Sequence, residues 1–201
     1  MPFLSRNAQV LKYFAQQCPA VGRTKLLKLA YLADLESRQL LGHPVSSFDY
    51  IWYDHGPFDT ALYSAIEELK AHGMADEEEV VVGLGYIEQR LVDTGQPAMF
   101  DFSPAESEIL YYVATKYQRT ALRELLSEVV YETGPMKAVQ RKGERLPMET
   151  LDGNQRDRIG FDLEDIIAAE QEIDAGHFRP ADEFFDELRS KTVRDGSELD
   201  H

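Results

Sequence analysis

Histidine, cysteine and carboxylate side chains catalyse reactions or bind metals, and in this sequence they form no pattern typical of such a site. Asp54 and His55 are adjacent, so in a helix or strand they point in different directions rather than toward one metal or substrate. His43, His55 and His72 lack the spacing of four residues, or the accompanying cysteine pairs, that metal ligands show. We interpret them as turn and surface histidines, and we predict no enzyme activity, no catalytic residue and no metal.

Three other groups have simpler explanations than a cofactor site. Gly83-Leu84-Gly85 has neither the third glycine nor the following helix of a phosphate loop, so we interpret it as a hairpin turn. The acids Glu77 to Glu79 could hold a cation, but consecutive acids more often form the solvated approach to a strand. Cys18 is the only cysteine, so it can form neither an intramolecular disulfide nor a zinc site by itself. We therefore expect no cofactor.

The net charge of the chain favours a basic protein as its large partner. At −15 over 201 residues, the molecule as a whole repels phosphate backbones, whose binding depends on Lys and Arg. One locally basic region could still bind DNA; it comprises Arg119, Arg123, Lys137, Arg141, Lys142 and Arg145. The alternative is a solvated face, or pairing with acidic segments of the same protein.

The last quarter of the chain differs from the rest in composition. Residues 141–160 are polar and interrupted by Gly143, Pro147 and Gly153, which indicates a mobile connection. In residues 161–201, thirteen Asp or Glu outnumber four Lys or Arg. We expect an acidic helical tail there, with helices over 162–175 and 180–189 and disorder from Gly196.

The remaining residues, 1–140, have the apolar spacing of one compact domain of class α+β, predominantly α-helical. The spacing predicts these elements: helices over Ser5–Gln17, Thr24–Leu41 (Thr24 as N-cap, Gly42 as stop) and Phe58 to about Gly73; strands over Phe48–Tyr53, Val80–Leu84 and Tyr86–Val92. Pro57 is expected at the first position of the third helix. Three helices, a strand and a β-hairpin in this order resemble a winged helix.

Two further helices are expected to pack on this unit. Ser103-Pro104-Ala105-Glu106 combines an N-cap serine, a proline at the first helical position and a glutamate three residues after the cap. The next helix is expected from about Thr120, on an apolar stripe that includes Leu125, Leu126 and Val130. No stretch approaches the roughly eighteen apolar residues of a membrane span, so we expect a cytoplasmic protein.

A set of short motifs carries a family resemblance. The helix segment TKLLKLAYLAD, residues 24–34, is followed by Gly42-His43-Pro44-Val45, Tyr53-Asp54-His55-Gly56-Pro57 and Tyr63. In this order the motifs resemble the Panacea domain, also called the SocA-like antitoxin domain, over roughly Val21 to Met136. Family members typically end with a histidine and a proline–tryptophan pair, whereas this chain has Tyr131 and Pro135-Met136. Methionine can fill part of the volume of a tryptophan.

The resemblance implies a bacterial or phage-encoded antitoxin that neutralises a toxin by direct contact and brings no catalytic residues. The residues that match the family pattern are Lys25, Leu27, Tyr31, Asp34, Tyr53, Gly56, Pro57 and Tyr63. Of these we take five as candidate toxin-binding residues: Lys25, Tyr31, Asp34, Tyr53 and Tyr63. The alternative for most of them is maintenance of the fold, because leucines and tyrosines at helical spacing usually belong to the core.

The segment Ile173–Arg189 is similar to the tails of small ribbon-helix-helix antitoxins, in which a short acidic helix wraps the toxin. Phe184, Phe185 and Leu188 would be its anchors. The alternative is that this stripe docks on its own domain.

We therefore expect an antitoxin that covers the active surface of a toxin encoded by the adjacent gene, as part of a toxin–antitoxin system of the kind used in phage defence. Two alternatives remain: an adaptor that delivers the toxin to a cytoplasmic protease, and a winged-helix autoregulator with weak or complex-dependent binding to operator DNA.

Overall fold

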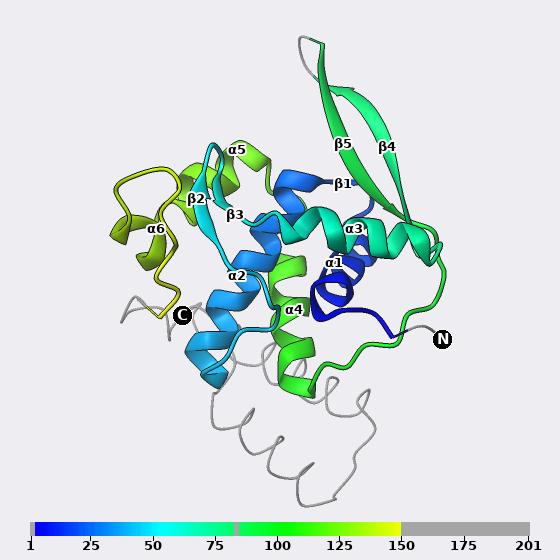
Figure 1. Cartoon of the computed structure of the whole chain (residues 1–201), viewed down its shortest axis with the longest axis horizontal. Helices are drawn as coiled ribbons and strands as arrows, with labels where there is room; N and C mark the ends of the chain where they lie inside the picture. Colours follow the sequence, from blue (N-terminus) through cyan, green and yellow to red (C-terminus); the bar gives the residue numbers. More distant parts are fainter. Residues whose placement is uncertain (1–2, 83–84, 150–201) are drawn as a thin grey trace, which may run out of the picture.

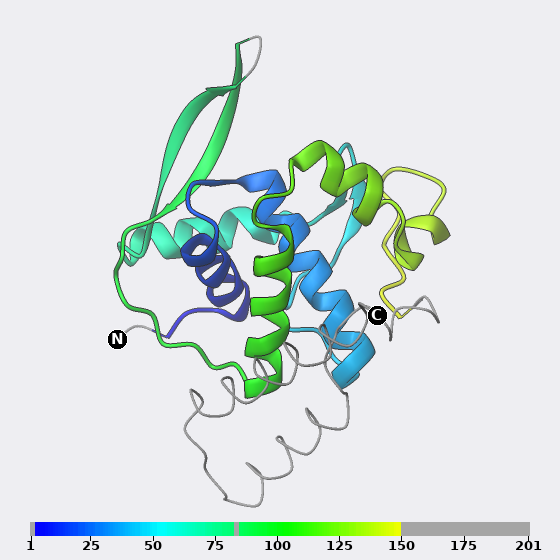
Figure 2. The same cartoon turned by 180° about the vertical axis from the view of Figure 1, so that it is seen from behind.

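A long helix, α2 (Arg23–Leu41), lies at the centre of the fold (Figure 1). In the computed structural model, which describes residues 3–82 and 85–149, every residue of α2 from Leu26 to Ser37 is buried. A helix buried on all sides must be covered by other elements. Here α1 (Arg6–Gln17), α4 (Pro104–Tyr117) and strands from two hairpins pack against it. Figure 2 shows α4 running alongside α2.

The ends of these helices follow from local sequence. Ser5 caps α1, and Ser103 and Glu106 form the predicted capping box of α4, so both starts are confirmed. Gly42 ends α2 as predicted, with a φ of 79° that favours glycine. The predicted N-cap Thr24 is wrong, because Gly22 occupies that position and Thr24 lies inside the helix.

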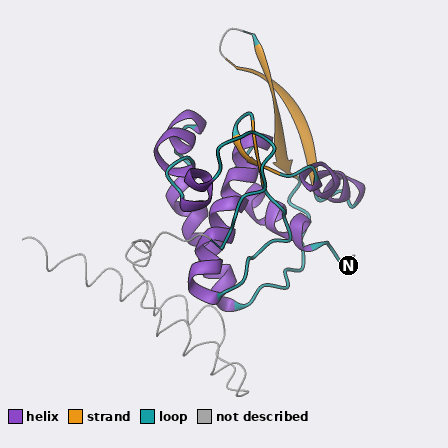
Figure 3. Cartoon of the chain, turned by 60° about the vertical axis from the view of Figure 1, so that its left-hand side comes forward, coloured by secondary structure: helices purple, strands orange, loops and turns teal. Residues whose placement is uncertain are grey.

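The larger sheet has three antiparallel strands in the order β1-β5-β4. The predicted hairpin is confirmed as β4 (Ala75–Val82) and β5 (Tyr86–Asp93), and it projects from the helical body (Figure 3). The acids at 76–79 were expected before the strand, but they lie within β4. A short strand that was not predicted, β1 (Val21–Gly22), pairs with β5.

A buried lysine holds the base of the projecting hairpin to the body. Lys12 of α1 is fully buried, and its ammonium donates to the Met74 carbonyl and to the Asp93 carboxylate. These contacts reach both strands of the hairpin at their body-facing ends, so α1 fixes its orientation.

The second hairpin differs from its prediction. β2 (Ile51–Tyr53) pairs with β3 (Gly56–Phe58), so Gly56 and Pro57 belong to a strand and not to a helix start. The third helix, α3, covers Ala61–Ala71, and its first turn follows Thr60. Pro57 has no backbone N–H to donate. The sheet tolerates this because both strands of a two-stranded sheet are edge strands.

After α4 the chain forms three short helical segments: α5 (Leu122–Glu124), the π-helix η1 (Leu125–Val130) and α6 (Gly134–Ala138). The regular helix expected from Thr120 is therefore replaced largely by a π-helix, in which Tyr131 N–H donates to the Leu126 carbonyl. The backbone of Arg145 then forms an isolated antiparallel β-bridge with Ile51 of β2, and the side chains of Leu146 and Met148 are buried.

The class α+β, with more helix than strand, is confirmed. The division into residues 1–140, 141–160 and 161–201 stays a prediction; the tail lies outside the described residues. None of the described helices combines the length and apolar character needed to cross a membrane.

Candidate functional site

The β2–β3 hairpin, the first turns of α2 and the start of α3 enclose a pocket of about 200 Å³, which we call the hairpin pocket. Its lining consists of aromatic, apolar and charged side chains: Arg23, Thr24, Leu27, Lys28, Tyr53, Asp54, His55, Phe58, Leu62 and Tyr63. The start of α2 and the later segment from Tyr53 to Tyr63 thus form one concave surface.

Three aromatic rings form one wall of the hairpin pocket. The Phe58 ring centroid lies 5.3 Å from that of Tyr53 and 6.2 Å from that of Tyr63. Tyr53 and Tyr63 are 49% and 46% exposed, whereas Phe58 is half-buried between them. The Arg23 guanidinium carbon lies 5.6 Å from the Tyr63 ring centroid, within cation–π range. The wall therefore offers aromatic area to a partner.

Lys28 lines the same pocket from α2 and is only 2% exposed. Its ammonium donates to the Pro57 carbonyl at 2.6 Å. Burial lowers the pKa of Lys28 from 10.5 to about 7, because the charged form loses its hydration.

Gly56 lets the hairpin approach this lysine closely. Its φ of +83° is a conformation that side-chain-bearing residues rarely adopt. A Cβ added to Gly56 would lie 3.4 Å from Val130 and 3.7 Å from both Leu126 and Lys28. The glycine therefore sits between η1 and α2, and this position brings the next carbonyl, that of Pro57, to Lys28.

The charged groups around the mouth of the hairpin pocket are paired within the chain. Asp54 accepts from Lys142 at 2.5 Å, and this contact lowers the pKa of Asp54. Arg23 pairs with Glu77 of β4. The carboxylate of Asp54 thus pairs with Lys142 rather than with the adjacent His55.

Of the five candidates within the described residues, the structure brings Tyr53 and Tyr63 together at the hairpin pocket. Tyr31 is fully buried, and its hydroxyl lies 2.7 Å from that of Thr133. Such a residue can affect a partner only through the fold, which favours the alternative of fold maintenance.

Asp34 is also part of the interior. Its carboxylate accepts hydrogen bonds from the Ser46 N–H, the Ser46 hydroxyl and the Tyr50 hydroxyl. Burial raises the pKa of Asp34, while these hydrogen bonds act in the opposite direction. The three bonds hold the segment between α2 and β2 against the helix.

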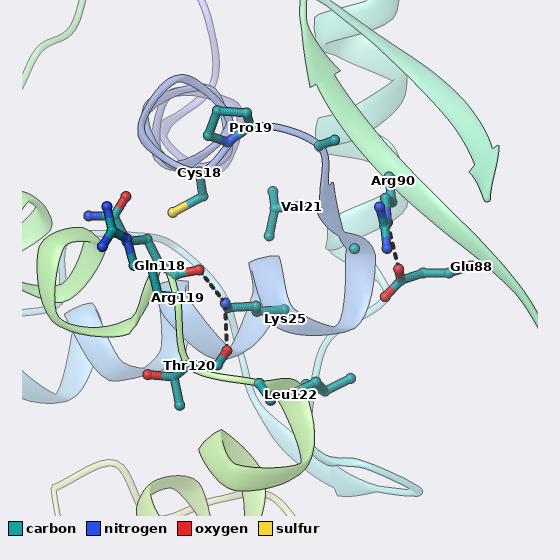
Figure 4. A pocket seen from close by; sticks show the side chains of 13 residues that line it. Cys18, Pro19, Val21, Lys25, Glu88, Arg90, Gln118, Arg119, Thr120 and Leu122 are labelled. Carbon is teal, nitrogen blue, oxygen red and sulfur yellow. Dashed lines mark hydrogen bonds and ion pairs between the residues drawn. The ribbon is translucent and has the colours of Figure 1, made fainter. Parts of the chain in front are cut away.

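Lys25 lines a second, larger pocket of about 410 Å³ (Figure 4). Its ammonium donates to the carbonyls of Gln118 and Thr120, both at 2.7 Å. These carbonyls follow the end of α4, where backbone acceptors lack helical partners. Lys25 therefore ties the end of α4 to α2. Across the pocket, Arg90 pairs with Glu88 at 2.7 Å.

Half of the locally basic region pairs with acids of the same chain. The contacts are Lys137 with Glu132, Lys142 with Asp54 and Arg145 with Asp49. Such pairing within the chain is the alternative to DNA binding that was considered from the sequence.

Lys28 and Phe58 are the site residues that the sequence analysis did not select. The burial of Lys28 could have been expected from the sequence. It precedes Tyr31 by three residues and Leu32 by four, which places it on the apolar side of the helix. Phe58 was assigned to a helix rather than a strand. Phe184, Phe185 and Leu188 lie outside the described residues. Within residues 3–82 and 85–149, no three His, Cys, Asp or Glu side chains gather where they could hold a metal ion.

Comparison with known proteins gives one match. The family model described as antitoxin SocA-like, Panacea domain, matches residues 26–135, which include all of α2 beyond its first turn, both hairpins, α3 and α4. No curated protein and no solved structure matches the chain. Because the matched segment spans more than half of the 201 residues, this protein belongs to the SocA-like, Panacea-domain antitoxin family.

Proposed function

We propose that this protein is an antitoxin that neutralises a toxin by direct binding, and that the hairpin pocket is part of the toxin-binding surface. The observation that carries the proposal is the pair of half-exposed tyrosines, Tyr53 and Tyr63, on either side of Phe58 within the family segment. Tyrosine and arginine are enriched among the residues that dominate binding energy in protein interfaces. The proposal includes a cytoplasmic location and a toxin encoded by the adjacent gene.

The exposed area of the aromatic wall is large enough to contribute substantially to the free energy of toxin binding. Burying the half of Tyr53 and Tyr63 that is now exposed would remove roughly 100 Å² of each from water. At about 25 cal/mol per Å², this corresponds to about 2.5 kcal/mol for each ring. Two such anchors fit the pattern of a few side chains supplying most of the affinity.

The acidic tail is the second proposed contact. Phe184, Phe185 and Leu188 would order on a basic toxin surface, and the surplus of acids in residues 161–201 would speed the encounter. Truncation after Gln155 tests this part: unchanged toxin affinity in the truncated protein would remove the tail from the proposal.

Autoregulation of an operon is a second candidate, which the order of elements favours. The predicted winged helix would consist of α1, α2 and α3 with the sheet β1-β5-β4. However, the projecting hairpin carries six carboxylates and only one basic residue, Arg90. α3 contains two acids, Glu67 and Glu68, and one basic residue, Lys70. Both elements would repel DNA phosphates, which argues against operator binding through them.

The deciding experiment is co-expression with the product of the neighbouring gene, scored by growth and by co-purification. We expect rescue with a stable complex, and loss of both when Tyr53 and Tyr63 are changed together to serine. Tyr86→Ser is the matched control, because Tyr86 is an 80% exposed tyrosine on the other hairpin. Growth arrest with no complex would refute neutralisation. Rescue through protease-dependent loss of the toxin would favour the adaptor alternative.

A further inference from the structure

The described residues accept only part of the hydrogen bonds that the Lys28 ammonium can donate. An ammonium has three N–H donors, and the contact that the structure shows is the one to the Pro57 carbonyl. Among the ion pairs of residues 3–82 and 85–149, none includes Lys28. A buried cation normally has an anionic partner, because the loss of hydration is otherwise uncompensated.

The acid that lines the pocket, Asp54, and the acid that pairs with its lining residue Arg23 are both occupied by other cations. Asp54 lines the pocket, but its carboxylate pairs with Lys142. Glu77 pairs with both Arg23 and Lys70. Burial is the cause of the lowered pKa of Lys28, with no stabilising contribution from a carboxylate. The anion that would complement Lys28 must therefore come from outside these residues.

The shape of the pocket limits what this anion can be. A volume of about 200 Å³ accommodates one side chain rather than a peptide segment or a nucleotide. The rings of Tyr53, Phe58 and Tyr63 would cover such a side chain and exclude water from it. In a site of low dielectric constant, the attraction between opposite charges is stronger than in solvent.

We propose that the hairpin pocket binds a carboxylate side chain, an aspartate or glutamate of the protein partner, which enters beside Tyr53 and Tyr63 and accepts a hydrogen bond from the Lys28 ammonium. The identity of the partner rests on the proposed function. The contact adds selectivity to the aromatic surface, because an uncharged side chain in the same place would leave the lysine uncompensated.

The test needs no toxin and no variant. The full chain is labelled with ¹³C at the lysine Cε positions, and Lys28 is titrated with pH in increasing N-acetylglutamate. N-acetylglutamine at matched ionic strength is the uncharged control. Because the carboxylate binds the protonated lysine, we expect the apparent pKa of Lys28 to rise by about one at a probe concentration ten times its dissociation constant.

The signal of Lys25 is the internal control, since its ammonium is already held by two carbonyls. A saturable rise confined to Lys28 and to the carboxylate probe supports the proposal. No change for Lys28, or equal changes with both probes, overturns it.

A second measurement follows if a toxin complex is obtained. We expect Lys28→Met to weaken toxin binding at least tenfold, and Lys137→Met, at an exposed lysine, to change it less than threefold. The two proposals can fail separately. A positive probe titration without toxin rescue refutes only the antitoxin function, whereas rescue without probe binding refutes only the carboxylate contact.

Discussion

Replacing Lys28 with methionine should alter how the stability of the fold depends on pH. In the folded chain burial lowers the pKa of Lys28 to about 7, whereas the unfolded chain has the ordinary value of 10.5. Between these values the unfolded state binds more protons than the folded state, so the free energy of unfolding rises with pH. Below pH 7 both states are protonated, and the full cost of the buried charge remains.

The size of the effect follows from the two pKa values. Each difference of one in pKa corresponds to about 1.4 kcal/mol. At pH 7 Lys28 is half-protonated when folded, and at pH 9 it is almost entirely neutral. Integration over this interval gives a rise of about 2 kcal/mol in the free energy of unfolding from Lys28 alone. Methionine keeps most of the side-chain volume and has no proton to lose.

Urea unfolding at pH 7, 8 and 9 measures this quantity. We expect the free energy of unfolding of the wild type to gain about 2 kcal/mol relative to Lys28→Met across the interval. Other titrating groups, including the Cys18 thiol, are present in both proteins and cancel in the difference. Lys137→Met, at an exposed lysine, should behave as the wild type.

Parallel pH profiles for the wild type and Lys28→Met would refute the reasoning. They would mean that Lys28 stays protonated in the folded chain up to pH 9, with its charge compensated. Lys28 would then not need an external carboxylate to compensate its charge.

Three further substitutions test the interior. Tyr31→Phe removes the contact with Thr133 and should lower the free energy of unfolding by about 1 kcal/mol, seen in urea unfolding, without changing toxin affinity. Asp34→Ala removes three hydrogen bonds and should cost about 3 kcal/mol in the same assay, and a loss below 1 kcal/mol would contradict it. Lys12→Met leaves Asp93 unpaired and should cost about 3 kcal/mol and speed amide exchange in both strands of the projecting hairpin.

The sequence predicted those parts of the fold whose signals are local. The start of the first helix near Ser5, the cap Ser103 and the stop at Gly42 are decided within four residues, and all three are confirmed. The two-residue strand Val21–Gly22 could not be predicted, because it exists only through pairing with residues about seventy positions away. Gly56-Pro57 has the sequence of a helix start, but pairing with Ile51–Tyr53 makes it a strand.

The candidate site was predicted in part for the same reason. The family motifs contain Tyr53 and Tyr63, but their spacing does not indicate that Phe58 lies between the two rings. Lys28 differs from Lys25 in the sequence only by which side of the helix it occupies. Its burial depends on Pro57 and on the close approach of Gly56, which the tertiary structure alone provides.

The order β1-β5-β4 leaves one side of β4 without a strand partner in the described sheet, so eight residues of backbone can pair with a second copy of the chain. Four consecutive acids, residues 76–79, belong to this edge strand, and like charges on two such strands oppose their pairing. The acidic run in β4 thus opposes edge-to-edge pairing of two chains at neutral pH.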